Sequence, residues 1–225
     1  MLTLAIDTST VPASVALGSG SVQIAARSLE ASATRSETVL PAIDEMLAEA
    51  GETASAVGAV VVGSGPGSFT GVRIGASLAK GLCYALDRPL YAFSSLAAAA
   101  VESGLEGRVF VLLDARGEQV YAAGYELGKD CLRELVQPCA DSVSVVIGRI
   151  PGGPGAWTFV GTGSQAHRGW LERQGCGVAS GAAAIPTASA LLSLFDWHPD
   201  DGLVHDVRSW EPRYVRLPQA ERETP

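Results

Sequence analysis

The sequence is poor in the residues that build metal and redox sites. It contains four cysteines and three histidines among 225 residues. No two cysteines form a CxxC pair, and His167, His198 and His205 have neither HxxxH nor HExxH spacing. No metal site can be assembled locally from such spacing. The thiols are therefore expected to be reduced and mostly buried, as in cytosolic proteins.

The sequence also lacks the long apolar runs of membrane proteins. It has no stretch of roughly 18 or more apolar residues, and no basic segment precedes an apolar one at the start, Met1-Leu2-Thr3-Leu4. We therefore expect a cytoplasmic protein that does not enter a membrane.

Basic residues are outnumbered as well. The chain has 16 Lys and Arg against 24 Asp and Glu, which gives a net charge of −8 and a pI near 4.9. An acidic surface repels phosphate backbones, so unaided binding of nucleic acid is disfavoured, although a local basic patch does not show in the total. The length is ample for a substantial hydrophobic core.

The most informative stretch present is Val57 to Leu86. Its pattern predicts a buried strand from Val57 to Val62, a glycine-rich turn from Gly63 to Gly71 and a helix from about Val72 to Leu86. A strand that runs through a glycine turn into a helix often presents backbone N–H groups to a phosphate. This helix, however, opens without the Lys of a P-loop, and the last Gly comes one residue too late for GxGxxG. A tight turn remains, in which Ser68 and Thr70 can cap the helix.

The predicted helix is apolar on most of its circumference. Four-residue steps place small and large residues on adjacent ridges, Gly71, Gly75, Ala79 and Cys83 on one and Ile74, Leu78, Leu82 and Leu86 on the other. Such a helix is buried on more than one side. One side can face a sheet, and the other needs a helix of the same chain or of a partner.

The chain opens with a predicted β-meander. Leu2–Ile6 reads as a strand that ends in Asp7-Thr8-Ser9-Thr10, and two further strands follow at 13–17 and 22–25. An acidic residue followed by small hydroxyl residues at this point is typical of the superfamily of actin, sugar kinases and heat-shock chaperones, where these groups serve a metal-bound phosphate. Alternatively, Asp7 is a turn residue that satisfies local N–H groups.

A polar connection, 30–36, leads to a predicted amphipathic helix over Glu37–Ala50. Ser36 is the expected N-cap and Gly51 the expected stop. With the strand and helix that follow, the order is βββαβα.

A second domain is expected after Ser103-Gly104, which gives domains 1–103 and 104–225. Its predicted elements are strands at 108–113, 119–125, 131–136 and 158–160, helices at 141–147 and 187–197, and a tail that packs back before a mobile end, 219–225. Asp114 follows its first strand as Asp7 follows that of the first domain. Gly161 and Gly163 form a second glycine turn, a weak nucleotide signal.

Four stretches together resemble one family. AIDTST, SETVLPAIDEML, GSGPGSFTGVRIGASLAKGL and LLDARGEQVYAAGYE are similar to the TsaB (YeaZ) family of tRNA threonylcarbamoyladenosine biosynthesis proteins, within the actin-like ATPase superfamily. The GPGSFTGVR block is the most specific of them. The resemblance implies an α/β fold of two tandem actin-like, ribonuclease H-like domains.

The resemblance also implies partners. Members pair with the related catalytic subunit TsaD and with the ATPase TsaE, and together they transfer threonylcarbamoyl from threonylcarbamoyl-AMP to N6 of the adenosine 3′ of the anticodon in tRNA. In this scheme the chain scaffolds and activates TsaD, meets tRNA through the complex and forms a homodimer when the partner is absent.

The metal ligands of the catalytic sister family are missing here. Ser95 and Ala99 stand where that family's HxxxH pair would fall, and neither is a usable ligand. The resemblance therefore implies no metal, no catalytic residue, no activity of the chain alone and no protease. It implies no cofactor bound by this chain alone, with ATP or ADP and threonylcarbamoyl-AMP at the complex interface. The alternative is an independent actin-like ATP-dependent kinase or phosphohydrolase.

Two sets of site residues follow. Possible phosphate or nucleotide contacts are Asp7, Thr8, Ser9, Gly161 and Gly163. The partner interface implied by the family lies on the first two long helices, at Val39, Leu40, Ile43, Leu47, Arg73, Ile74, Leu78 and Leu82. Gly71, Gly75 and Ala79 are expected to let the partner's helix approach closely; alternatively, both faces are covered within the chain.

Overall fold

The protein is built on two mixed β-sheets. The computed structural model describes residues 1–30, 35–181 and 183–215. The first five-stranded sheet has the order β3 (Val22–Leu29), β2 (Ala13–Ser19), β1 (Leu2–Asp7), β4 (Val57–Gly63) and β5 (Leu90–Phe93). β1, β2 and β3 pair antiparallel, whereas β4 and β5 are added parallel to β1.

The second sheet repeats this topology. Its order is β10 (Gly177–Val178), β9 (Thr158–Val160), β6 (Gly107–Asp114), β7 (Gln119–Gly128) and β8 (Cys131–Ser142). β6, β7 and β8 pair antiparallel, and β9 and β10 run parallel to β6. The predicted tandem of two related α/β units is thus confirmed.

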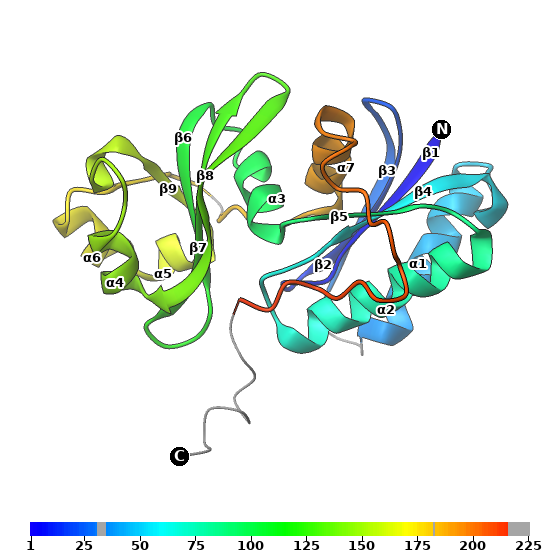
Figure 1. Cartoon of the computed structure of the whole chain (residues 1–225), viewed down its shortest axis with the longest axis horizontal. Coiled ribbons are helices and arrows are strands. Elements are labelled where there is room, and N and C mark those ends of the chain that lie inside the picture. Colours follow the sequence, from blue (N-terminus) through cyan, green and yellow to red (C-terminus); the bar gives the residue numbers. More distant parts are fainter. Residues whose placement is uncertain (31–34, 182, 216–225) are drawn as a thin grey trace, which may run out of the picture.

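Helices and sheets alternate in layers (Figure 1). α1 (Arg35–Glu49) and α2 (Phe69–Leu86) cover the outer face of the first sheet. α3 (Ser95–Glu102) and α7 (Ala188–Trp197) lie between the two sheets. The outer side of the second sheet carries α4 (Val143–Gly148), α5 (Thr162–Ala166) and α6 (Arg168–Arg173). Short 3-10 turns occur at Ala54–Ala56 and Pro154–Ala156.

Each interlayer space holds a hydrophobic core. The central core joins Ala5 and Val61 of the first sheet to Val111 and Tyr125 of the second through the alanine-rich helix α3. Since helices cover both faces of the first sheet, β1 and β4 are buried along almost their whole length. Although α7 comes late in the chain, in the predicted second domain, it packs on β1, β2 and β4 of the first sheet.

Both long helices differ slightly from their predicted bounds. α1 begins at Arg35, so Ser36 lies inside the helix rather than at its N-cap. The predicted stop is confirmed, because Gly51 has φ +72° and its N–H bonds to Ala48 O at 3.0 Å, while the Glu52 N–H bonds to Leu47 O at 2.9 Å. Residues 31–34 of the predicted polar connection lie outside the described residues.

α2 begins three residues earlier than predicted. Ser68 is the N-cap, as expected, and its Oγ accepts a hydrogen bond from Gly71 N at 3.3 Å. Because this cap satisfies the first turn, Phe69, Thr70 and Gly71 are helical, and the expected capping role of Thr70 is wrong.

In the second sheet, β8 continues to Ser142 instead of ending at Val136. It stays paired with β7 through register shifts near Gly124, so the predicted helix over 141–147 starts only at Val143. The pattern also missed β5, α3, α5, α6 and β10, which are short.

The tail packs back, as predicted. The predicted tail starts at Trp210, and Arg213 N bonds to Ser64 O at 2.9 Å. The segment before it lies along β5, where Ala92 N bonds to Gly202 O at 2.8 Å and Val204 N to Leu90 O at 2.9 Å. The expected mobile end, 219–225, lies outside the described residues. Within the described part of the chain, no helix is long and apolar enough to span a membrane.

Candidate functional site

The Asp7 carboxylate lies in the interior at the end of β1. Asp7 is only 1% exposed. Oδ1 accepts hydrogen bonds from Ser9 N at 2.8 Å and Ser9 Oγ at 2.7 Å, and Oδ2 accepts one from Ser95 Oγ at 2.9 Å. A buried carboxylate needs such donors to offset its lost hydration. We call Asp7, Ser9 and Ser95 the carboxylate lock.

The glycine-rich turn closes directly over this lock. A Cβ at Gly63 would clash with Asp7 Oδ2, and a Cβ at Gly67 would clash with Ser9 O. Ser68 N donates to Ser9 O at 2.7 Å. The turn therefore packs directly against the end of β1.

Thr8 is used in the same closed packing. Its Oγ1 donates to Gly71 O at 2.7 Å, and a Cβ at Gly75 would clash with Thr8 Oγ1. Thr8 and Ser9 are 2% and 1% exposed. In this conformation Asp7, Thr8 and Ser9 offer no surface for a phosphate, and the turn-residue interpretation of Asp7 fits the geometry.

The position of the absent histidine pair is filled by small side chains. Ser95 and Ala99, both on α3, are 0% exposed. Ser95 Oγ also accepts a hydrogen bond from Gly65 N at 3.2 Å, so it links the lock to the glycine turn. No group of three His, Cys, Asp or Glu residues that could hold a metal ion occurs within the described part of the chain.

The second glycine turn is also structural. Gly161 has φ +97°, and a Cβ there would clash with Leu112 O, while a Cβ at Gly163 would lie 3.0 Å from the same oxygen. These glycines let the start of α5 approach β6 closely. Asp114 repeats one feature of Asp7: its Oδ1 accepts from the N–H two residues on, that of Arg116, at 2.8 Å. Unlike Asp7, Asp114 is exposed.

The tail covers the glycine turn from outside. Arg213 N donates to Ser64 O at 2.9 Å, and the Tyr214 ring lies 5.3 Å from that of Phe69. Between this tail, the glycine turn and Tyr121 of β7, a crevice of about 30 Å³ remains. Such a volume is on the scale of one water molecule and far below that of a ligand pocket.

The structure divides the predicted interface residues into two groups. Val39, Ile43 and Leu47 are 0%, 3% and 4% exposed and lie in the core under α1, so they offer no surface to a partner. Leu40 is 42% exposed. Ile74, Leu78 and Leu82 are partly buried on α2, and Arg73 is exposed.

The small ridge of α2 faces inward. Gly71, Gly75 and Ala79 are buried against the first sheet, so their expected role in admitting a partner's helix is wrong. Small residues are needed there because Thr8 approaches the helix closely. The outer face of α2 instead carries Ser77, Gly81, Tyr84 and Ala85, which are exposed. Gly81 lies four residues after Ser77, and Tyr84 and Ala85 lie three and four residues after Gly81. This spacing is the sequence pattern that indicates a second face of the helix.

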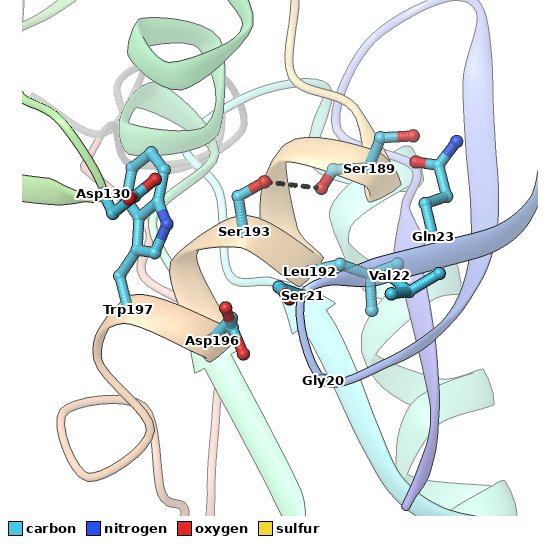
Figure 2. Close-up of a pocket in the computed structure, with 10 residues that line it drawn as sticks. All are labelled: Gly20, Ser21, Val22, Gln23, Asp130, Ser189, Leu192, Ser193, Asp196 and Trp197. Carbon is cyan, nitrogen blue, oxygen red and sulfur yellow. Dashed lines mark hydrogen bonds between the residues drawn. The ribbon is translucent and has the colours of Figure 1, made fainter.

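A separate cavity lies between α7 and the turn that joins β2 and β3 (Figure 2). It has a volume of about 510 Å³. Asp130 and Asp196 are its charged residues, Trp197 also lines it, and Ser193 Oγ donates to Ser189 O at 3.4 Å. With two carboxylates and no basic residue in its lining, this cavity does not suit a phosphate.

An open groove of about 910 Å³ runs beside the C-terminal half of α2. Lys80, Tyr84, Arg88, His205 and Arg208 line it together with acidic and apolar residues, Asp87, Asp206, Gly81, Cys83 and Val207. Burial raises the pKa of the Cys83 thiol to about 11. The thiol therefore stays protonated and is a poor nucleophile at neutral pH.

The layered arrangement is that of the actin-like ATPases, as predicted. The activator of the 2-hydroxyisocaproyl-CoA dehydratase from Clostridium difficile, solved with bound ADPNP, superposes with a TM-score of 0.53 at 12% identity, over 88% of this chain and 95% of that one. At this identity the likeness concerns the fold.

Family membership follows from closer relatives. Residues 29–192 match the family model TsaD, tRNA N6-adenosine threonylcarbamoyltransferase. The chain is 30% identical to the tRNA threonylcarbamoyladenosine biosynthesis protein TsaB of Escherichia coli, over 100% of this chain and 99% of that protein. The structure of YeaZ from Pseudomonas aeruginosa superposes with a TM-score of 0.76 at 33% identity, covering 95% and 99% of the two chains. The chain belongs to the TsaB family, which takes part in tRNA threonylcarbamoyladenosine biosynthesis, and the predicted resemblance is confirmed.

Proposed function

We propose that this chain is a non-catalytic subunit, required with TsaD and TsaE for transfer of threonylcarbamoyl from threonylcarbamoyl-AMP to N6 of the adenosine 3′ of the anticodon in tRNA. The carboxylate lock is the observation that carries this proposal. Asp7, the acidic residue that an actin-like ATPase would turn to a metal-bound phosphate, has both oxygens engaged by Ser9 and Ser95 in the interior.

Three further contacts support a closed site. The glycine turn packs on Ser9, the tail packs on the glycine turn through Arg213, and only a water-sized crevice remains beside Tyr121. Opening this region to a nucleotide would break buried hydrogen bonds, each of which leaves unsatisfied groups behind. The chain alone is therefore expected to bind no nucleotide, and ATP or ADP and threonylcarbamoyl-AMP are assigned to the interface of the complex.

The proposed surface for TsaD is the outer face of α2 with the adjoining part of α1. Tyr84 is 79% exposed and Leu40 42% exposed, so both large side chains are open to a partner. A Cβ at Gly81 would have no neighbour within 4 Å, so the chain's own packing does not require glycine there. Glycine inside a helix destabilises it by about 1 kcal/mol relative to alanine. Close approach by another helix would account for Gly81.

The same face has the chemistry of an interface. Ile74, Leu78 and Leu82 are partly exposed beside it, and a fully buried Leu contributes roughly 1.5–3 kcal/mol. Without TsaD, two copies of this chain can cover the face by forming a homodimer. tRNA is reached through the assembled complex.

Reconstitution tests the proposal. The purified chain is combined with TsaD and TsaE, and threonylcarbamoyl transfer to unmodified tRNA is measured together with ATP turnover, with each protein omitted in turn. Transfer that needs every protein, with no turnover by this chain alone, is the expected result.

Two results would contradict the proposed function. ATP turnover by the chain alone that is lost in Asp7→Ala would identify a live actin-like kinase or phosphohydrolase site. Transfer by TsaD and TsaE at the full rate without this chain would also refute the proposed function.

A further inference from the structure

An exposed arginine–aromatic cluster lies at the start of α2. The Arg73 guanidinium sits 4.1 Å above the centre of the Phe69 ring and 5.9 Å from that of Tyr214. Arg73 Nε donates to Tyr214 Oη at 3.3 Å, so the helix and the tail hold one another. Phe69 and Tyr214 are each 37% exposed. We call Phe69, Arg73, Arg213 and Tyr214 the arginine–aromatic cluster.

The cluster is positively charged on an acidic chain. Among the described residues, neither Arg73 nor Arg213 forms an ion pair, whereas Arg133 and Arg168 are paired with Glu126 and Glu172. The first turn of α2 contains no acidic residue. The N-terminal end of this 18-residue helix adds positive potential of its own. The net charge of −8 therefore conceals a local site that attracts anions.

Two other hollows of the described part of the chain differ from the cluster in charge. The groove at the far end of α2 mixes its basic residues with Asp87 and Asp206, and it lies at the negative end of the helix. The cavity of Figure 2 is acidic. At the cluster, the exposed residues Ser68 and Thr70 beside Phe69 are polar and uncharged, and Glu211, two residues before Arg213, is an exposed acidic residue.

We propose that the arginine–aromatic cluster contacts a single-stranded segment of the tRNA, with its arginines on phosphates and its aromatic rings against an unstacked base. Aromatic rings beside arginines are the usual means by which proteins hold single-stranded nucleic acid. The cation–π contacts and the Arg73–Tyr214 hydrogen bond fix these groups before RNA arrives, which lowers the entropy lost on binding. This inference rests on the proposed function, since it needs a complex that acts on tRNA, and it assigns Arg73 to RNA rather than to TsaD.

The test measures the affinity of the complete reconstituted complex for unmodified tRNA by fluorescence anisotropy at several salt concentrations. In Arg73→Gln/Arg213→Gln, affinity should fall roughly tenfold or more, and the slope of log K against log salt should shrink by about 1.4, since each phosphate contact on a single strand contributes about 0.7. Tyr214→Leu removes a stacking ring without changing charge. It should weaken binding about fivefold or more and leave the slope unchanged.

The matched control is Arg108→Gln/Arg173→Gln. It removes the same charge from two exposed arginines of the second half, one of which also lies near an aromatic ring, that of Trp157 at 5.9 Å. The control should change affinity and slope far less than the cluster variant does. If both double variants lowered the tRNA affinity equally, the loss would reflect net charge alone, and the assignment of the cluster as an RNA contact would be overturned.

Sedimentation of the same samples separates the remaining outcomes. An intact complex with unchanged tRNA affinity in Arg73→Gln/Arg213→Gln would overturn the RNA contact alone. Dissociation of TsaD from that variant would mean that the cluster is a protein interface and would overturn it as well. Failure of the proposed function is read independently, from wild-type transfer that does not need this chain.

Discussion

Ser95 Oγ donates a hydrogen bond to Asp7 Oδ2 at 2.9 Å, across 88 positions of the sequence. The bond ties the first residue of α3 to the last residue of β1, and both residues are at most 1% exposed. It occupies the carboxylate oxygen that Ser9 leaves unbonded. One hydroxyl thus links the central helix layer to the first sheet and helps to keep the acidic side chain away from solvent.

Ser95→Ala should destabilise the chain by about 1–3 kcal/mol, because it leaves a buried charged acceptor short of a donor. Urea unfolding followed by circular dichroism measures the change. Ser77→Ala is the control, since Ser77 is exposed on the outer face of α2 and its loss should be nearly neutral. Equal stability of Ser95→Ala and wild type would show that the lock contributes nothing to folding.

Two glycines of α2 should respond in opposite directions to alanine. Gly75→Ala places a methyl group against Thr8 Oγ1 and should destabilise the chain by about 1–3 kcal/mol. Gly81→Ala meets open space within one chain and should stabilise the fold of the monomer by up to about 1 kcal/mol. Thermal unfolding of the two variants measures both effects. A stabilising Gly75→Ala would contradict the inward orientation of the small ridge.

The same Gly81→Ala variant should weaken assembly with TsaD, because its methyl group would hold the partner's helix away from α2. Titration calorimetry against TsaD measures the loss. If Gly81→Ala bound TsaD as tightly as wild type does, the glycine at position 81 would have no explanation. The assignment of the outer face of α2 to the TsaD interface would then be weakened.

Leu78→Glu and Tyr84→Glu should each abolish the complex with TsaD and yield a monomer when the chain is alone. Both changes place a charge on a surface that we assign to burial between subunits. Sedimentation velocity measures the two assemblies. Val22→Glu is the control, since Val22 is 63% exposed on β3, away from α2, and should leave assembly intact. Full transfer activity with Leu78→Glu would refute the interface.

Stability should decrease with rising pH through the titration of Cys83. Burial raises its pKa from 9.0 to about 11, so the folded chain binds more protons than the unfolded chain in this window. The contribution is fully present below pH 9.0 and is lost as the pH rises through about 11. Burial also raises the pKa of Tyr125, which acts in the same direction at higher pH.

Urea unfolding across this window measures the effect. The fall in the free energy of unfolding should be shallower in Cys83→Ala than in wild type. Cys131→Ala, which removes an exposed thiol, is the matched variant. An identical slope in Cys83→Ala would mean that the folded-state thiol titrates as it does in the unfolded chain.

Local patterns were sufficient for much of the fold. The β-branched run from Val57, the glycine turn after it and the 3.6-residue period beyond it predicted β4 and α2, and Ser68 and Gly51 marked helix ends correctly. Short elements with little periodicity, such as α5 and β10, gave no comparable signal. Periodicity needs several turns or pleats to rise above composition.

The sequence by itself determined the order of most elements, the repeated α/β unit and, through the GPGSFTGVR block, the family. Only the tertiary structure decided which apolar ridge of α2 faces the sheet, because both ridges have the same period and differ in volume alone. The small ridge faces inward since Thr8 leaves no room for larger side chains. The closure of Asp7 was likewise decided in three dimensions, because its donor Ser95 lies 88 positions away and only folding brings the two together.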